Sequence, residues 1–184
     1  APVWTHETLS QFSRPAVLNE MVYIGSTDET VYALNPEDGE PMWATDIDSQ
    51  ITAAPAVIEE LVLVTARNGT VYGFDRTSGE IKWTAKSNDS YDAAPTVVDD
   101  KVYVGGSSMG LHAIDATEGT ENWVVEIEGR VTSTPAVADG RVYAAAEERG
   151  VVALDVATGD RQWTESPSGV FNVSPVVAED RVYA

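Results

Sequence analysis

Few side chains in the sequence could carry out chemistry, and the histidines are the first to consider. His6 and His112 are the only two in the 184-residue chain. Ser107, Ser108 and Asp115 lie near His112, so a serine–histidine–aspartate arrangement for nucleophilic catalysis can be drawn. However, His112 occupies a position that is tyrosine in two earlier segments of similar sequence, and Asp115 opens a tight turn. We therefore interpret His112 as a packed ring and predict no catalytic residue.

Acidic residues and glycines suggest two further kinds of site. Asp46 and Asp48, and the segment 89–92, carry carboxylates of the kind that bind a hard cation, but neither group has calcium-loop spacing. The glycines of segment 105–110 follow a predicted strand without opening a helix, which argues against a phosphate-binding loop. The chain has no cysteine, which excludes disulfides and thiolate metal sites. From its residues, the sequence predicts neither a metal nor a cofactor.

A repeat with a period of about 40 residues must position all of these groups. Different residue types keep this period, which indicates a repeat architecture. The repeated residues are the tryptophans Trp43, Trp83, Trp123 and Trp163, the glycines Gly39, Gly79, Gly119 and Gly159, and the prolines Pro15, Pro55, Pro95, Pro135 and Pro175. The whole chain, 1–184, reads as one domain with complete units at 15–54, 55–94, 95–134 and 135–174. Residues 1–14 then end a preceding unit, around Trp4, and residues 175–184 begin a further one.

The unit that starts at Pro55 predicts four short strands. Residues 56–58 and 61–64 are apolar runs separated by an acidic turn, and residues 71–74 and 81–83 give the third and fourth strands. Between the second and third strands, Asn68-Gly69 predicts a two-residue hairpin turn with positive φ at both positions. No segment has a sustained helical period, so we predict an all-β chain of four-stranded antiparallel sheets. Because each sheet is apolar on both faces, radial stacking as the blades of a β-propeller is favoured.

The charge of the chain limits its partners. There are 30 acidic and 11 basic residues, and the formal net charge is −19. Such a surface repels nucleic acid and anionic membranes. Many carboxylates and few lysines are typical of halophilic proteins, so we expect a protein adapted to high salt, with an acidic binding surface as the alternative. No apolar run is long enough to span a membrane, and no signal peptide is recognisable within the chain.

The turn before each tryptophan resembles a known motif. The pattern A-x-D-x-x-T-G-x-x-x-W is complete in Ala153, Asp155, Thr158, Gly159 and Trp163, and the other units match it in part. It resembles the tryptophan-docking motif of pyrroloquinoline quinone-type propeller repeats, and the likeness extends over about the whole chain. The resemblance implies rings of seven or eight blades, so we expect an open arc of a larger ring. The open blade edges, such as the one at 182–183, are then expected to favour self-association.

The resemblance implies two possible functions. Cofactor-free members, such as the propeller lipoprotein of the outer-membrane assembly machinery, imply a non-enzymatic binding or scaffold module for a protein or small-ligand partner. The alternative is a blade segment of a quinoprotein dehydrogenase that oxidises alcohols or sugars with quinone and calcium. The lack of cysteine and of an assembled catalytic group favours the first. Asn88 and Asn172 open glycosylation sequons between units, which favours an extracytoplasmic or cell-surface location.

A candidate partner-binding ring lies three residues before each proline. Repeats keep scaffold residues constant and vary the binding face, and these positions are polar and not identical. The resemblance places them at the start of the innermost strand, near the axis. The candidate residues are Thr52, Asp92, Thr132 and Asn172, with Tyr91, Arg130 and Phe171 from the same loops. An equally simple interpretation is that these residues only begin a strand.

Overall fold

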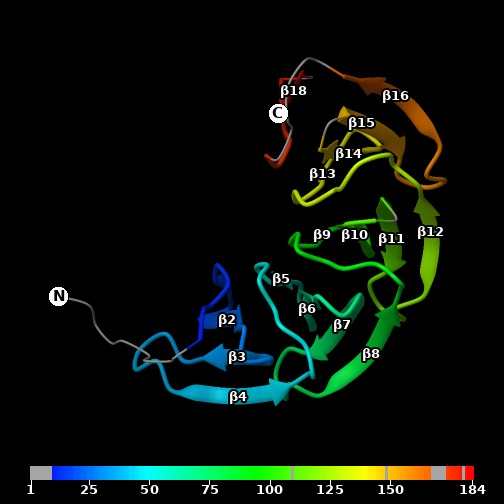
Figure 1. Cartoon of the computed structure of the whole chain (residues 1–184). Helices are drawn as coiled ribbons and strands as arrows, with labels where there is room; N and C mark the ends of the chain where they lie inside the picture. The colour runs from blue at the N-terminus through cyan, green and yellow to red at the C-terminus, as the bar shows by residue number, and fades with distance from the viewer. Residues whose placement is uncertain (1–9, 109, 148, 167–172, 180) are drawn as a thin grey trace.

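The computed structural model describes residues 10–108, 110–147, 149–166, 173–179 and 181–184, which form strands joined by turns and loops. Figure 1 shows them as blades placed one after another along an open arc. The first strand of each unit lies on the inner side of the arc and the fourth on the outer side. Nowhere in these residues is there a helix of the length and apolarity that a membrane span requires. The position expected for Trp4 lies outside the described residues.

Each complete unit forms one antiparallel sheet whose four strands follow sequence order. The first two blades consist of β1 (Ala16–Leu18), β2 (Met21–Gly25), β3 (Thr30–Leu34) and β4 (Pro41–Asp46), then β5 (Ala56–Val57), β6 (Leu61–Thr65), β7 (Thr70–Asp75) and β8 (Ile81–Lys86). The next two consist of β9 (Thr96–Val98), β10 (Lys101–Gly105), β11 (Leu111–Asp115) and β12 (Glu121–Val125), then β13 (Ala136–Ala138), β14 (Arg141–Ala146), β15 (Gly150–Asp155) and β16 (Arg161–Glu165). β17 (Val176–Ala178) and β18 (Arg181–Tyr183) pair as a further two-stranded sheet. The predicted all-β open propeller arc is confirmed.

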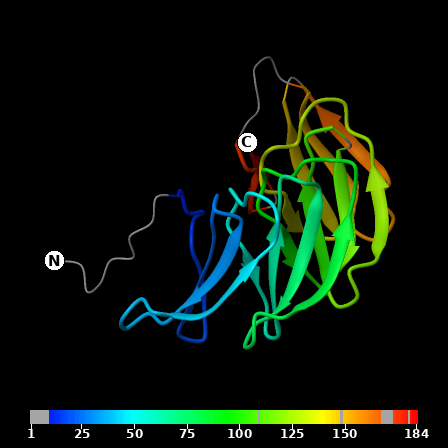
Figure 2. The same ribbon diagram turned by 60° about the horizontal axis from the view of Figure 1, so that its bottom comes forward.

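The apolar core lies between the blades. In β6, Val62, Leu63 and Val64 are all fully buried, so both faces of the strand are covered. Separate apolar clusters join the first blade to the second, the second to the third, and the third to the fourth. The tilted view of Figure 2 shows the blades standing face to face. Each blade therefore needs its neighbours to bury its faces.

The tryptophan of each of the first three blades contacts the next blade. Trp83 Nε1 donates a hydrogen bond of 3.0 Å to the backbone oxygen of Ala116. Trp43 and Trp123 make the equivalent bond, in each case to a carbonyl 33 residues further along the chain. The indole of Trp83 also covers the turn glycine Gly119, where an added Cβ would lie 2.5 Å from a ring carbon. One side chain thus links two consecutive units.

A small residue faces each tryptophan across the outer strand pair. These partners are Ala33, Gly73, Ala113 and Ala153, and the strand register shifts immediately after each of them. At Gly73, an added Cβ would lie 2.4 Å from an atom of the Trp83 ring, so the indole rests directly on the backbone. The recurring bulge and the small residue together leave room for the indole.

The aspartate that opens the outer turn accepts several hydrogen bonds. Asp75 Oδ1 accepts the hydroxyl of Thr77 at 2.7 Å and the backbone N–H groups of Thr77 and Ser78 at 3.0 and 2.9 Å. These bonds, with that of the Thr77 hydroxyl the strongest cause, hold the pKa of Asp75 well below its usual range. The pKa of Asp155 is also lowered, chiefly by the backbone N–H groups of Ala157 and Thr158.

We expect the stability given by this turn to be lost in acid. The pKa of Asp75 is lower in the folded chain than in the unfolded chain, so its contribution is complete above about pH 4 and disappears as the pH falls through the folded pKa. Urea midpoints of the wild type and Asp75→Asn, measured from about pH 7 down to about pH 2, should therefore converge in acid. A constant difference over that range would show that the charge of Asp75 does not stabilise the turn.

The hairpin at Asn68-Gly69 differs from the prediction. Gly69 has a φ of 80°, but Asn68 is not among the residues with positive φ. The Gly69 N–H donates to the oxygen of Ala66, and the Asn68 side chain accepts the N–H of Thr70. The loop is therefore a turn closed by one left-handed glycine, because the asparagine is used as an Asx acceptor. Positive φ at two consecutive residues occurs instead between first and second strands, as at Asp99 and Asp100.

Candidate functional site

The predicted ring residues lie on the connections that lead from the outer strand of one blade to the inner strand of the next. Thr52, Asp92 and Thr132 line one shallow pocket of about 440 Å³ near the axis. Arg14 and Ser174 contribute to the same pocket. The repeat therefore brings equivalent positions of consecutive blades together. Phe171 and Asn172 lie outside the described residues.

Asp92 is the centre of a polar group in this pocket. Its Oδ1 accepts a hydrogen bond of 2.8 Å from Arg67 Nε, and the Thr52 hydroxyl lies 3.5 Å from the same oxygen. The Arg67 guanidinium also donates to the side-chain oxygen of Gln50 at 3.3 Å. The side chains of Arg67 and Asp92 are 50% and 27% exposed, so the pair is open to a partner. Arg67 was not predicted as a site residue.

A second polar group surrounds Thr132. Its hydroxyl donates to Glu147 Oε1 at 3.2 Å, and the backbone N–H of Glu147 donates to the carbonyl of Arg130 at 2.9 Å. Arg130 is exposed beside them. Glu147 and Arg67 occupy the same position of the hairpin in their blades, and each bonds by its backbone to the preceding connection. This hairpin position also varies among the units, a signal that would have identified both residues from the sequence.

Tyr91 does not belong to this surface. Its side chain is 1% exposed and packs in the cluster between the second and third blades. The hydroxyl donates to Ser87 Oγ at 2.9 Å, and burial raises the pKa of Tyr91 to about 12. The equivalent residues Ile51 and Val131 are fully buried as well. Tyr91 therefore supports the loop from inside, and its apolar counterparts in the other units indicate this role.

His112 lies in a buried polar group and forms no catalytic triad with Asp115. His112 Nδ1 is 3.2 Å from Glu121 Oε2, and Nε2 is 3.7 Å from Asp89 Oδ2. The ring meets that of Tyr91 edge-on, with centroids 5.5 Å apart. Asp115 Oδ1 instead accepts the backbone N–H groups at positions 117 and 118, which is the turn role predicted for it. His112 is a packed ring with two carboxylate neighbours that the sequence pattern did not indicate.

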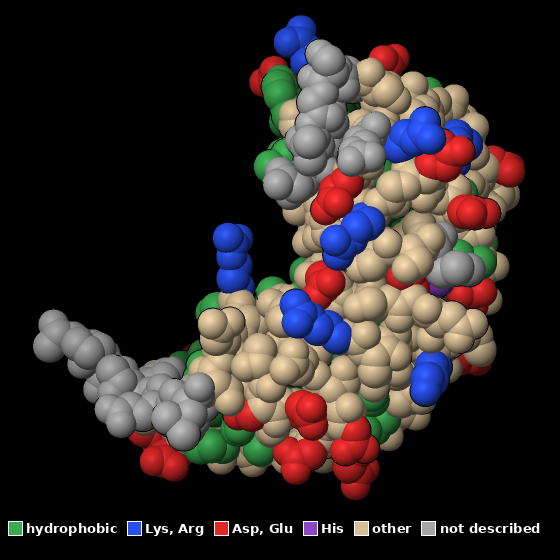
Figure 3. Space-filling view, in the orientation of Figure 1, with side chains coloured by type: hydrophobic (Ala, Val, Ile, Leu, Met, Phe, Trp, Pro, Cys, Tyr) green, Lys and Arg blue, Asp and Glu red, His purple; other side chains and the backbone are tan. Residues whose placement is uncertain are grey.

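The described residues of the axial pocket do not suit calcium and quinone. Among the described residues, Asp92 is the only carboxylate that lines the pocket, and Arg67 holds it by an ion pair. Within the part of the chain that the structure describes, no group of three His, Cys, Asp or Glu side chains is placed to hold a metal ion. Figure 3 shows basic side chains spread along this view of the arc among acidic ones, without a single basic patch. The pocket can offer hydroxyl groups and one exposed ion pair for hydrogen bonding to a partner.

Known proteins share this fold. A BamB structure from Moraxella catarrhalis is 22% identical, with a TM-score of 0.84 over 98% of this chain and 57% of that chain. Quinohemoprotein alcohol dehydrogenase ADHIIG from Pseudomonas putida HK5 is 18% identical, with a TM-score of 0.74 over 83% of this chain and 33% of that chain. The computationally designed Ika4 protein is 18% identical, with a TM-score of 0.76 over 85% of this chain and 98% of that chain. At these identities the likeness shows the fold alone.

A comparison with family models shows which family the chain belongs to. None of the curated proteins matches the chain. The chain spans just over half the length of the BamB structure, 57%, so the activity of such a whole protein is not transferred to it. The family model described as outer membrane protein assembly factor BamB matches residues 1–184. Because that match covers every residue, the chain belongs to the BamB family of pyrroloquinoline quinone-type propeller repeats.

Proposed function

We propose that the chain is a non-enzymatic binding and scaffold propeller that acts outside the cytoplasm and holds a protein partner on its axial pocket. The observation that carries the proposal is the exposed Arg67–Asp92 pair, whose Asp92 lines the same pocket as Thr52 and Thr132. The described side chains there are donors and acceptors on rigid blade connections, and none of them is a nucleophile held by a base. Such a surface suits hydrogen bonding to another protein.

Cross-linking from the pocket tests this proposal. A photoreactive amino acid at Thr52 or Thr132 should trap one defined protein in cells that express the chain, and wild-type chain in excess should compete with the trapping. The same amino acid at Glu37, on an exposed turn outside the pocket, is the matched control. Equal trapping from position 37 would count against an axial site. The trapped protein, once identified and purified, then allows affinity to be measured.

We expect Asp92→Asn with Arg67→Gln to weaken that complex by roughly fivefold, because an exposed charged pair contributes up to about 1 kcal/mol. Glu37→Gln, an exposed acid elsewhere, should leave the affinity unchanged. Calorimetric titration of the same protein with pyrroloquinoline quinone and calcium should give no heat of binding. Binding of the quinone, followed by turnover of alcohols or sugars, would replace the scaffold proposal with the dehydrogenase alternative.

A further inference from the structure

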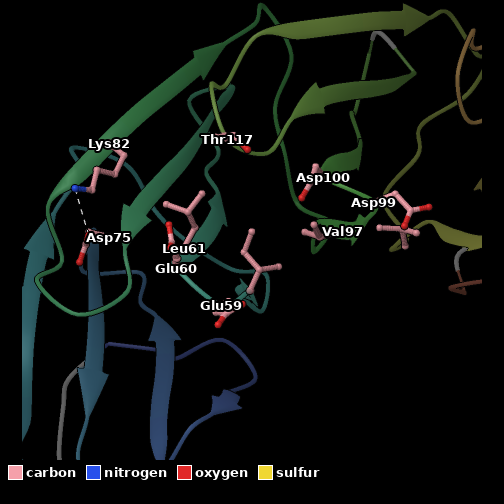
Figure 4. A pocket seen from close by; sticks show the side chains of 11 residues that line it. Glu59, Glu60, Leu61, Asp75, Lys82, Val97, Asp99, Asp100 and Thr117 are labelled. Carbon is pink, nitrogen blue, oxygen red and sulfur yellow. Dashed lines mark ion pairs between the residues drawn. The ribbon is translucent and has the colours of Figure 1, made fainter.

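A large cavity lies between the second and third blades, on turns outside the axial pocket. It has a volume of about 710 Å³. Ile58, Leu61 and Val97 give it an apolar wall that belongs to the cluster joining these blades. Figure 4 shows Glu59 and Glu60 on the side of the second blade and Asp99 and Asp100 on the side of the third. The cavity is therefore apolar inside and acidic at its edge.

Two smaller side chains explain why a large cavity occurs at this interface. Tyrosine stands at the middle of the second strand in the other units, as Tyr23, Tyr103, Tyr143 and Tyr183, but the second blade has Leu63. Between the third and fourth blades, Tyr103 lines the equivalent space and its hydroxyl donates to the oxygen of Val156 at 3.2 Å. The space that remains there is only about 190 Å³. Leu63 carries no ring to extend into the cleft.

The second small residue is Ala116, on the facing turn of the third blade. The backbone N–H of Ala116 donates to Asp100, as that of Arg76 donates to Glu60 one blade earlier. The two residues thus hold equivalent positions in consecutive units. Ala116 has no side chain beyond Cβ, so the turn adds little to fill the cleft.

The interface between the first and second blades shows what occupies this space elsewhere. The guanidinium of Arg76 lies there, where Nε donates to the backbone oxygen of Glu59 at 2.7 Å and Nη1 lies 3.4 Å from the hydroxyl of Tyr23. The counterpart of Glu59 in the third blade is Asp99, which lines the large cavity. The chain thus places its own arginine in one cleft, and no described arginine lines the next cleft.

The charges at the edge of the cavity complement an arginine. Lys82 Nζ pairs with Asp75 Oδ2 at 3.3 Å, so the one basic residue among the described lining residues already has an acidic partner. Among the described residues, no cation pairs with the side chains of Glu59, Glu60, Asp99 or Asp100. All four are exposed at the mouth. The aliphatic part of an arginine would contact Ile58 and Leu61 while its guanidinium meets these carboxylates.

We propose that this cavity is a second binding site, which receives an arginine side chain presented by a protein partner. The inference rests on the proposed binding function but concerns a different surface from the axial pocket. The arginine would take the place that Arg76 takes one blade earlier. An apolar residue would lack the charge that the four carboxylates favour, and a phosphate or carboxylate ligand would be repelled by them.

The test uses a short probe and the whole chain. Isotope-labelled protein is titrated at about 0.3 M salt, where exposed charges more than one Debye length apart are largely screened, with the peptide acetyl-Gly-Arg-Gly-amide. Amide shifts should concentrate at Val97, Val98 and Thr117. The same peptide with citrulline, which is neutral and similar in shape, should produce none. Equal shifts with both peptides, or shifts spread over all acidic turns, would overturn the proposal.

Variants then locate the binding. The double variant Asp99→Asn with Asp100→Asn removes two charges and keeps side chains that tolerate positive φ. It should weaken binding of the peptide by roughly fivefold. The control Asp139→Asn, in the neighbouring small cavity, should leave binding unchanged. Ala116→Arg should fill the cavity from within and abolish binding. Retained affinity in both the Asp99/Asp100 variant and the Ala116→Arg variant would disprove the site. If the arginine peptide does not bind the cavity but axial cross-linking is intact, only this inference is wrong. If axial cross-linking is not observed, the proposed function is wrong.

Discussion

Trp83→Ala should destabilise the chain by about 3–5 kcal/mol, the range for truncating a large buried aromatic residue. The side chain is 8% exposed, donates to the oxygen of Ala116 and covers Gly119. The change removes the indole and leaves the carbonyl of Ala116 without this donor, at the junction of two blades. Urea denaturation followed by circular dichroism at molar salt measures the loss. A loss below about 1 kcal/mol would contradict the stabilising role assigned to the tryptophan.

Trp163→Ala is the matched control. Trp163 faces Ala153 as Trp83 faces Gly73, but it is only partly buried, beside β17 and β18. No described residue accepts a hydrogen bond from its indole. We therefore expect a loss of at most about 2 kcal/mol. Equal losses at the two positions would show that the contact within a blade, and not the contact between blades, accounts for the effect.

The melting temperature should fall markedly when salt is lowered from about 1 M to about 0.1 M, because the Debye length then grows from about 3 Å to about 10 Å. The net charge of −19 makes repulsion among carboxylates the main effect of that change. The acidic turns at one end of the blades, such as Asp99-Asp100 beside Glu59 and Glu60, bring like charges close together. Thermal unfolding followed by circular dichroism at several salt concentrations checks this expectation.

A charge-reduced variant separates repulsion from general salt effects. Glu37, Glu80 and Glu118 are exposed turn residues, and replacing each with lysine changes the charge by two units per site. The variant should melt higher than the wild type in low salt and show a weaker dependence on salt. Parallel salt curves for the two proteins, or a wild-type melting temperature that rises on dilution, would remove the interpretation of the chain as adapted to high salt.

The architecture could be predicted from the sequence because every unit repeats the same requirement. Tryptophan, a turn glycine and a small residue opposite the indole return once in every unit, and only a stack of sheets uses them all. The hairpin at Asn68-Gly69 was predicted incorrectly, because only Gly69 has positive φ. The side chain of Asn68 instead accepts the backbone N–H of Thr70.

The candidate site was harder to predict from the sequence, because the residues that contact one another there are distant in the chain. Arg67 meets Asp92 across 25 residues, and nothing local to either residue reveals the pair. Tyr91 was assigned to the surface as an aromatic loop residue, although its apolar equivalents Ile51 and Val131 indicated burial. The large cavity depends on Leu63, which replaces a tyrosine, and on Ala116, which gives the facing turn of the next blade only a small side chain. Only a comparison of equivalent positions in consecutive units, taken in pairs across the interface, would have revealed it.

The bond that runs from the tryptophan of each of the first three blades to a carbonyl 33 residues ahead has an evolutionary consequence. Each unit carries the indole for its own forward junction and the turn that receives the indole of the unit before it. Any junction is therefore made of the same two parts, whichever units meet there. A gene for such a chain can gain or lose whole units by unequal recombination and still encode matching junctions. A change by a fraction of a unit would separate an indole from its carbonyl, so lengths in this family should evolve in steps of one blade.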